Sequence, residues 1–326
     1  MIISKSPLRI SLGGGGTDLA SYYEKHSGFF ISAAINRYVY TCINRPFNKK
    51  IILKYSNNEE VSSVDKINHN IIREVIRYVN PSETAIEITS LADIPSGTGL
   101  GSSGSFTTSL LKGVLRYYER DIDERSLAEL ACKIEIDILG ESIGKQDQYI
   151  ASFGGIKAFS IDKNGNVSIV DLLIGEKAIE YFEERLLLFF TGFTRDASSI
   201  LKDQKIRSER NEDSIMDNLH LVKSLGYEFK NAIEQNNFEH FGDLLNQHWN
   251  IKSKRSSGMT NSKIDSLYQS ALANGARGGK LVGAGGGGFL LLYADRPGQL
   301  RTYMQSLGVR EVQFKFEMAG CHLVGM

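Results

Sequence analysis

Three glycine-rich clusters, far apart along the 326-residue chain, constrain its fold more than any other feature. They read GGGG at residues 13–16, GTGLGSSG at 97–104 and GAGGGG at 283–288. Each cluster alone is compatible with a tight turn or a loose hairpin. Glycine, however, lowers the stability of an ordered segment by roughly 0.5–1 kcal/mol per residue relative to alanine. Three clusters are therefore better explained by close approach of the backbone to ligands than by turns alone.

The middle cluster lies between Pro95 and the hydrophobic stretch LLKGVLRYY, which predicts a helix from about Gly101 to Tyr118. The N–H groups of a first helical turn have no partner within the helix and can bind an anion. One serine is enough to cap a helix, yet serines stand at positions 102, 103 and 105. Extra hydroxyls can bind phosphate oxygens or ligate Mg²⁺, a hard cation. The segment therefore favours a phosphate site over a simple turn with a serine cap.

Two other nucleotide-binding motifs fit this segment less well. The P-loop ends in Gly-Lys-Ser/Thr, and the segment has no lysine. Gly99, Gly101 and Gly104 satisfy the G-x-G-x-x-G dinucleotide fingerprint, and Glu119 lies twenty residues after Gly99. Glu119, however, stands at the end of a predicted helix and a second helix follows, so the βαβ unit is missing. An NAD-dependent oxidoreductase is thus disfavoured.

The apolar patterning predicts an α+β protein with two halves, residues 1–180 and 181–326. Strands are expected before the first glycine cluster, within RLLLFFTG, as two strands within 280–295, and at 29–35, 38–45, 50–56, 85–91, 156–162, 167–173, 311–316 and 321–325. Helices are expected at 67–79 and 101–118, after Asp123, and around 215–233, 238–249 and 264–271.

Composition excludes several classes of function. The chain has 38 basic and 38 acidic residues, so no general field attracts nucleic acid or an anionic membrane. Three distant cysteines predict neither a disulfide framework nor a zinc site, and six scattered histidines predict no metal site. No run reaches the ~18 apolar residues of a membrane span, and the polar N-terminus does not resemble a signal peptide. A cytoplasmic protein is expected.

Together the clusters resemble the three motifs of the GHMP kinases, a family of ATP-dependent small-molecule kinases. PSGTGLGSSGSF is similar to their phosphate loop and KLVGAGGGGF to their third motif. PLRISLGGGGTD resembles their first motif, with Pro7, Arg9, Thr17 and Asp18 at the recurring positions. The resemblance spans about residues 5–325. It implies a ribosomal-protein-like N-terminal domain, a ferredoxin-like C-terminal domain and ATP bound between them.

The resemblance also implies roles for particular residues. Asp147, in GKQDQY, would accept the proton of the attacking hydroxyl, and Arg9 would keep it ionised. Glu135 shares a predicted helix face with Ala131 and Ile138, where a carboxylate is costly unless it is paired or binds metal. The resemblance makes it a Mg²⁺ ligand together with Ser103. The alternative for Asp147 is a helix cap or a surface carboxylate, and the alternative for Glu135 is a partly exposed residue at the edge of its helix. ATP would contact the phosphate loop through Pro95, Gly97, Gly99, Leu100, Gly101, Ser102, Ser103, Gly104 and Ser105.

The first motif indicates which molecule would accept the phosphoryl group. Galactokinases have Gly-Glu-His-Thr-Asp where this chain has GGGGTD, so galactose is disfavoured. With FTGFTRDASSIL at 190–201, the motif looks most like D-glycero-D-manno-heptose 7-phosphate kinases and bacterial fucokinases, which phosphorylate an anomeric hydroxyl. The expected product is the 1,7-bisphosphate, with a fucokinase-like sugar 1-kinase or a non-catalytic nucleotide sensor as alternatives.

Several residues would bind this acceptor. The expected substrate contacts are Gly15, Gly16, Thr17, Asp18, Arg195, Gly285 and Gly286. Lys202 and Lys280 are further candidates for holding the substrate's phosphate, and Lys145 and Lys252 are weaker ones. Each of these basic residues is also compatible with a solvated surface charge. The expected partners are ATP and a sugar phosphate, and a homodimer stays open.

Overall fold

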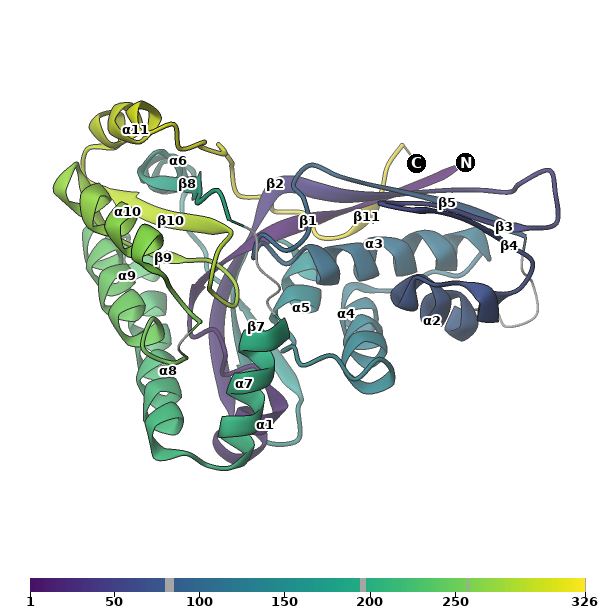
Figure 1. The fold of residues 1–326 in the computed structure, drawn as a ribbon, viewed down its shortest axis with the longest axis horizontal. Helices are drawn as coiled ribbons and strands as arrows, with labels where there is room; N and C mark the ends of the chain where they lie inside the picture. Colours follow the sequence, from purple (N-terminus) through teal and green to yellow (C-terminus); the bar gives the residue numbers. More distant parts are fainter. Residues whose placement is uncertain (80–84, 194–197, 257, 326) are drawn as a thin grey trace.

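The computed structural model describes residues 1–79, 85–193, 198–256 and 258–325 (Figure 1). The strands are β1 (Ile2–Gly13), β2 (Gly28–Asn44), β3 (Ile51–Lys54), β4 (Asn58–Val61), β5 (Ile86–Ala92), β6 (Ile156–Ile161), β7 (Val167–Asp171), β8 (Leu186–Phe190), β9 (Ala276–Leu281), β10 (Phe289–Ala294) and β11 (His322–Leu323). The first helices are α1 (Ala20–His26), α2 (Asn70–Val79), α3 (Ser102–Tyr117), α4 (Glu124–Cys132), α5 (Gln146–Phe153) and α6 (Glu176–Arg185). The remaining helices are α7 (Ser198–Glu209), α8 (Asp213–Glu234), α9 (Phe238–Lys252), α10 (Ser262–Ala273) and α11 (Pro297–Ser306). The α+β prediction is confirmed.

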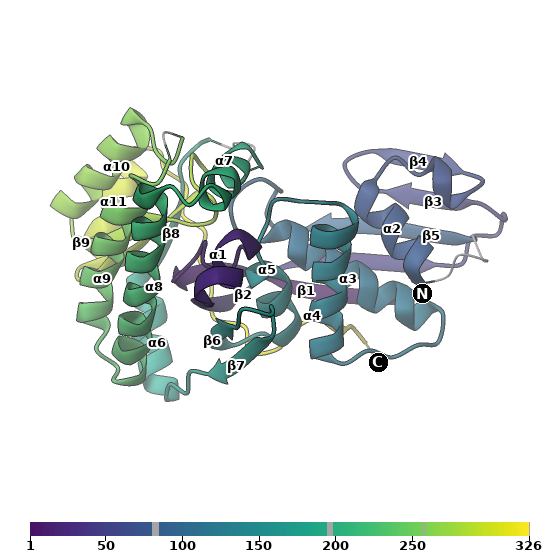
Figure 2. The same cartoon turned by 90° about the horizontal axis from the view of Figure 1, so that it is seen from below.

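The strands form two sheets. Eight strands make the larger sheet, in the order β11-β1-β2-β5-β3-β4, with β6 paired to β2 and β7 paired to β6. The smaller sheet has the antiparallel order β8-β10-β9. Helices α2, α3, α4 and α5 gather on one face of the larger sheet, and α8, α9 and α10 lie at the other end of the molecule (Figure 2). The hairpin predicted at 156–173 is confirmed as β6 and β7.

Strand β2 replaces two predicted strands, because the residues between them do not form a turn. Asn36 and Arg37 stay extended and form an irregularity in the pairing with β1, between the pairs Pro7–Tyr38 and Leu8–Ile35. The first half of β2 is buried on both faces, whereas its second half alternates between buried and partly exposed residues. One long strand therefore pairs with β6 along its first half and with β5 along its second half.

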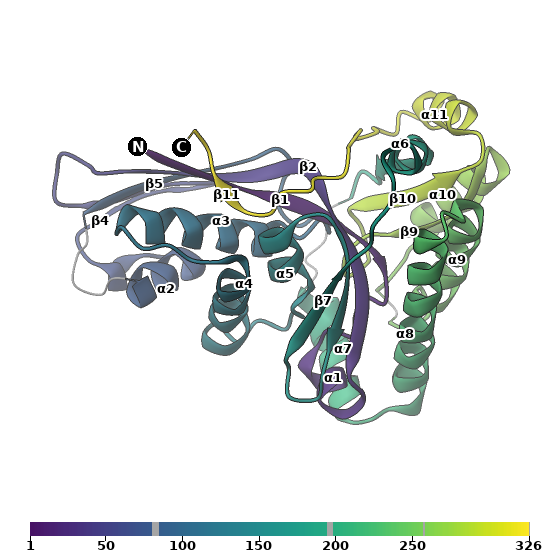
Figure 3. The ribbon, with the colours of Figure 1, turned by 180° about the vertical axis from the view of Figure 1, so that it is seen from behind.

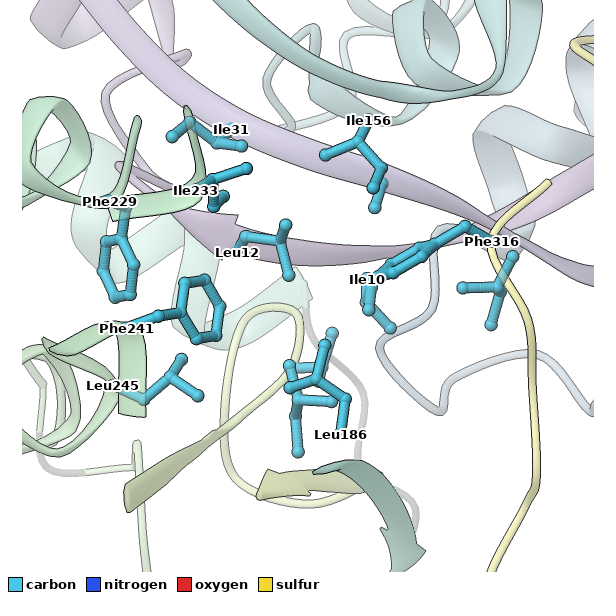
Figure 4. Close-up of a cluster of buried hydrophobic side chains, with 14 of the residues drawn as sticks. Ile10, Leu12, Ile31, Ile156, Leu186, Phe229, Ile233, Phe241, Leu245 and Phe316 are labelled. Atoms are coloured by element: carbon cyan, nitrogen blue, oxygen red, sulfur yellow. The ribbon is translucent and has the colours of Figure 1, made fainter. Parts of the chain in front are cut away.

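The main hydrophobic core joins the two halves of the chain. Ile10, Leu12 and Ile31 from β1 and β2 pack in one cluster with Phe229 and Phe241 from α8 and α9 (Figure 4). Neither half buries these side chains alone, so the position of each half depends on the other. The boundary near residue 180 stays a prediction.

The chain after α11 returns to the larger sheet (Figure 3). Its predicted strand at 311–316 is wrong, because only isolated bridges form there, at Glu311 and Phe316. The tail then crosses the end of α5. The N–H of Cys321 donates to the carbonyl of Ala151 at 2.8 Å, and β11 pairs with β1. The tail thereby braces α5 before it completes the sheet.

Candidate active site

The second and third glycine clusters pack directly against each other. A Cβ atom built on Gly283 would lie 2.6 Å from the Cα of Gly99, and one on Gly288 would lie 2.1 Å from the carbonyl oxygen of Thr98. Side chains cannot approach backbone atoms so closely, so glycine is required at both positions. The third cluster thus supports the loop that leads into α3.

This loop leaves the first turn of α3 without a side-chain cap. The N-cap is Gly101, at φ 76°, and no side-chain cap bond forms there. Leu100 is fully buried, and its carbonyl accepts a 3.0 Å hydrogen bond from the N–H of Arg9. Pro95 and Gly97 remain exposed. The loop is therefore anchored at its end and keeps the uncapped amides that an anion site needs.

The serines of this loop are not equivalent. Ser103 is exposed and Ser102 partly so, as a ligand contact requires. Ser105 is fully buried, and its hydroxyl lies 2.7 Å from the carbonyl oxygen of Pro7 and 3.1 Å from that of Gly101. The expectation that the Ser105 hydroxyl meets a phosphate is wrong: it faces inward, one turn after Gly101, and joins α3 to β1.

Arg9 and Asp147 form an ion pair beside this loop. The Nε and Nη2 atoms of Arg9 each lie 2.7 Å from Oδ1 of Asp147, and Nη1 lies 2.5 Å from the carbonyl oxygen of Gly99. Arg9 is 6% exposed and Asp147 29% exposed. Asp147 is thus fixed on its inner side, while part of its carboxylate remains accessible.

Glycine also sets the position of Asp147. This residue lies in the first turn of α5, which crosses α3 at Gly104. A Cβ atom on Gly104 would lie 2.8 Å from the Cβ of Asp147 and 2.9 Å from the backbone nitrogen of Gln148. The two helices can pack at this distance only because position 104 has no side chain.

Glu135 is fully buried behind the start of α3. It lies in a π-helical turn, η2 (Lys133–Ile138), that continues α4. The wider turn changes which residues face inward, so Ile138, expected on the same buried face, is 44% exposed. Oε1 of Glu135 accepts from the Ser103 hydroxyl and Oε2 accepts from Gln148 Nε2 at 2.7 Å. Burial raises the pKa of Glu135 to about 7, despite these hydrogen bonds.

The oxygen atoms of Glu135 and Ser103 are of the kind that ligates a magnesium ion. Mg²⁺ prefers oxygen ligands and is usually held by one or two carboxylates together with substrate phosphates and water. The carboxylate of Glu135 and the hydroxyl of Ser103 touch each other at the mouth of the uncapped helix. Among the described residues, no group of three or more His, Cys, Asp or Glu side chains could hold a metal. A magnesium ion here would therefore depend on phosphate oxygens for its other ligands.

A pocket of about 100 Å³ opens beside the Arg9–Asp147 pair. Gly15, Gly16 and Asp18 line it, as expected. Asp18 is 6% exposed, and its two oxygens accept from the N–H groups of Gly16 at 3.0 Å and Gln146 at 3.1 Å. Burial raises the pKa of Asp18 above its usual value. Asp18 thus connects the first glycine cluster to the start of α5.

Four basic side chains and two carboxylates line this pocket. Besides Arg9 these are Lys252, Arg255 and Lys280. Lys280 and Lys252 were candidates from the sequence, whereas Arg255 and the neighbouring His248 were missed. Burial lowers the pKa of Lys252 to about 7, with the positive charges of Arg255 and Arg9 as further causes. Buried cations with so few counterions indicate a site for an anion.

Other predicted substrate contacts lie elsewhere. Gly285 and Gly286 pack against Met259, and the pocket is lined by Gly283 and Ala284 in their place. Thr17 is fully buried, and its hydroxyl contacts the carbonyls of Gly14 and Phe29, both at 2.8 Å.

The remaining basic candidates do not reach the pocket. Lys202 is exposed and does not line it. Lys145 turns away and donates to the carbonyl of Gly165 at 2.6 Å. Arg195 lies outside the described residues. Over the described part of the chain, no helix is both long and apolar enough to cross a membrane.

Two family models and several known proteins match this chain. The family model described as GHMP kinases N terminal domain matches residues 70–155, and the one described as GHMP kinases C terminal matches residues 229–309. The chain is 28% identical over 305 residues to D-glycero-alpha-D-manno-heptose 7-phosphate kinase of Campylobacter jejuni, covering 90% of this chain and 89% of that protein. It is 28% identical over 227 residues to the bifunctional fucokinase/GDP-fucose pyrophosphorylase of Arabidopsis thaliana, which covers 69% of this chain and 21% of that protein.

Solved structures share the fold. A D-glycero-D-manno-heptose 1-phosphate kinase from Bacteroides thetaiotaomicron superposes with a TM-score of 0.83 at 24% identity, covering 100% of this chain and 99% of that one. Lactococcus lactis galactokinase complexed with galactose gives a TM-score of 0.79 at 18% identity, covering 98% and 94% of the two chains. The arrangement of both sheets and their helices is therefore that of these kinases.

Proposed function

Because this chain belongs to the GHMP kinase family, we propose that it phosphorylates the anomeric hydroxyl of D-glycero-D-manno-heptose 7-phosphate. ATP donates the phosphoryl group, and the products are ADP and the 1,7-bisphosphate. The similarity to the Campylobacter jejuni heptose 7-phosphate kinase extends over nine-tenths of the chain. It supports a sugar-phosphate acceptor more strongly than the similarity to the fucokinase, which spans about a fifth of that longer protein.

The charge of the pocket carries the proposal. Four basic side chains and two carboxylates line the pocket. Burial lowers the pKa of Lys252 to about 7 and that of Lys280 well below its usual value, so both lysines lose charge unless an anion lies beside them. An acceptor that already carries a phosphate dianion would stabilise their charged forms, which a neutral sugar cannot do.

Each residue beside the pocket has a specific role in this proposal. Asp147 takes the proton of the anomeric hydroxyl. At the same time the hydroxyl oxygen bonds to the γ-phosphorus, and the bond from that phosphorus to the leaving ADP oxygen breaks. Arg9 keeps Asp147 ionised and offsets charge on the transferred group. Ser103 and Glu135 would hold Mg²⁺, which supplies charge neutralisation to the triphosphate when bound. The loop from Gly97 to Gly104 would hold the triphosphate through its backbone amides.

An acceptor panel tests the proposal. ADP release is measured with heptose 7-phosphate, heptose 1-phosphate, unphosphorylated heptose, fucose, galactose and mevalonate. We expect heptose 7-phosphate to have the highest kcat/KM, with unphosphorylated heptose lower by about 100-fold, because hydrogen bonds to charged groups contribute about 1.5–3 kcal/mol each. Phosphorus NMR of the product should show a new phosphate on the anomeric carbon.

Two results of the panel contradict the proposal in different ways. Turnover of fucose without turnover of heptose 7-phosphate removes the proposed acceptor and keeps the kinase. Nucleotide binding without turnover of any acceptor favours a sensor of the same fold.

Gly104 provides a prediction about the geometry of the base. Gly104→Ala is expected to lower kcat by about 10- to 100-fold, because the added methyl group displaces α5 and misplacement of a reacting group costs this much. Steady-state kinetics with heptose 7-phosphate and a thermal melt measure the effect. The control is Gly298→Ala on α11, where an added Cβ meets no atom within 4 Å. Full turnover by the Gly104 variant would show that the α3–α5 contact does not position Asp147.

A further inference from the structure

Arg255 is held rigidly in the wall of the pocket, with one end left unused. It lies just after α9 and is 3% exposed. Its Nε donates to Oδ1 of Asn218 at 2.8 Å, and its Nη1 lies 3.3 Å from both the carbonyl of Gly15 and Oε1 of Gln204. Its Nη2 is buried and has no hydrogen-bond partner among the described residues. A buried, unpaired guanidinium nitrogen is costly, so an arginine fixed in this way is expected to meet an anion.

His248, on α9, is a second buried polar side chain at the pocket. It lines the same pocket, is 1% exposed, and neither ring nitrogen has a hydrogen-bond partner among the described residues. Buried polar groups are nearly always hydrogen-bonded. Burial lowers the pKa of His248 well below its usual value, and the charges of Lys280, Lys252 and Arg255 lower it further. The ring is therefore neutral and carries one N–H that is free to donate.

Lys252 adds a charge on the same helix face, four residues after His248. Its Nζ donates to the carbonyls of Leu281 at 3.0 Å and Gly283 at 2.5 Å. An ammonium has three N–H bonds, so one remains after these two contacts. No carboxylate pairs with Lys252 or Arg255 in the described structure within salt-bridge distance; the pocket's two carboxylates are Asp18 and Asp147.

The three side chains reach different parts of the pocket lining. Arg255 contacts the first glycine cluster, α7 and α8, through Gly15, Gln204 and Asn218. Lys252 donates to the carbonyl of Gly283, which packs on Gly99 of the phosphate loop. Arg255 therefore borders the first glycine cluster, whereas Lys252 also borders the loop proposed to hold the nucleotide.

We propose that Arg255, His248 and Lys252 form a buried subsite for the phosphate monoester that the acceptor already carries. The inference rests on the proposed function in one respect, namely that the acceptor is a sugar phosphate. The subsite selects phosphorylated acceptors over free sugars, since a neutral hydroxyl leaves its charges unpaired. Lys280, whose Nζ donates to the carbonyl of Leu12 at 3.0 Å, also lines the pocket, and burial lowers its pKa well below the usual value.

The first test compares Arg255→Gln with Lys254→Gln, which removes an exposed charge from the preceding residue. The Arg255 variant is expected to raise KM for heptose 7-phosphate by about 10- to 100-fold, as the loss of a charged hydrogen bond implies. The KM for unphosphorylated heptose and the KM for ATP should each change by less than about threefold. The control should behave as the wild type. A matching rise in KM for ATP would overturn the proposal, because the cations would then serve the nucleotide.

His248→Leu is a second variant that is safe for folding. Leucine is close to histidine in volume, and no hydrogen bond is lost, because both ring nitrogens are unpaired. Replacing an unpaired buried polar group with an apolar one is nearly neutral or stabilising. We expect an unchanged or raised melting temperature together with a reduced preference for the phosphorylated acceptor. A variant with wild-type preference would show that His248 belongs only to the core.

A binding measurement separates this inference from the proposed function. Isothermal titration of the full chain with heptose 7-phosphate, and with inorganic phosphate, is performed without ATP. Wild type and Lys254→Gln should bind, and Arg255→Gln should bind at least about 10-fold more weakly. If the acceptor panel selects another substrate but this difference persists, the subsite stands and the proposed acceptor falls. Equal binding by all three proteins, or no binding by any, overturns the subsite.

Discussion

Asp147→Asn is expected to lower kcat by about 10³-fold, within the range that general-base catalysis contributes. Asparagine keeps the shape of the side chain but cannot accept the proton of the attacking hydroxyl. The ion pair with Arg9 becomes a hydrogen bond to a neutral amide, because the Oδ1 of asparagine can still accept from the guanidinium. The KM for ATP should stay within about threefold of wild type, because the phosphate loop is a separate backbone structure.

Single-turnover kinetics and nucleotide binding measure this effect. Asp121→Asn is the matched control, since Asp121 is an exposed aspartate distant from the pocket. Retention of more than about a tenth of wild-type kcat would show that Asp147 orients the acceptor and that proton transfer does not depend on it.

Glu135→Gln is expected to have the second-largest effect. The substitution preserves size and removes the carboxylate that contacts Ser103, so the Mg²⁺ concentration for half-maximal activity should rise by about 10- to 100-fold. At a fixed millimolar Mg²⁺ concentration the turnover should fall by a similar factor. Folding should be retained, since glutamine can still hydrogen-bond to Ser103 and Gln148.

Magnesium titrations of activity, and Mn²⁺ binding followed by electron paramagnetic resonance, test this prediction. The control is Asp137→Asn, an exposed carboxylate two residues further along the same turn. An unchanged Mg²⁺ dependence in the Glu135 variant would assign the buried carboxylate to structure alone.

Sequence patterns predicted the parts of the site that depend on backbone. Glycine clusters are visible in a sequence because only a close backbone approach justifies their cost, and Gly99 and Gly283 do touch. The partnership of Arg9 and Asp147 came from the family resemblance, since 138 residues separate them in the chain. Their roles in catalysis stay predictions.

The sequence did not indicate that His248 and Arg255 line the pocket. His248 stands between Leu245 and Trp249 on a helix whose periodicity indicates only a core face. Arg255 lies in KSKRSS, which reads as a solvated basic turn. Both are buried through contacts with segments distant in the chain, such as Gly15, and local patterning carries no information about such contacts.

The wrong sequence predictions also arise because local patterning does not show which distant segments a residue contacts. Ser105 looked like a ligand-binding hydroxyl because composition does not show which side of a helix faces inward. Asn36 and Arg37 looked like a turn, yet the partner strand absorbs them in an irregular pair. Helix α7, which the sequence analysis missed, has weak apolar periodicity. Helix α6 was missed although its apolar residues do follow a helical period.

The tail that braces α5 also has a consequence for how the enzyme matures. Residues 317–323 leave the ribosome after α5 and after every other strand of the larger sheet, yet Cys321 contacts Ala151 in the helix that carries Asp147. Until those residues emerge, the outer edge of β1 is an unpaired strand, which invites association with other chains. A nascent chain that ends before them would stay inactive and would need protection by chaperones.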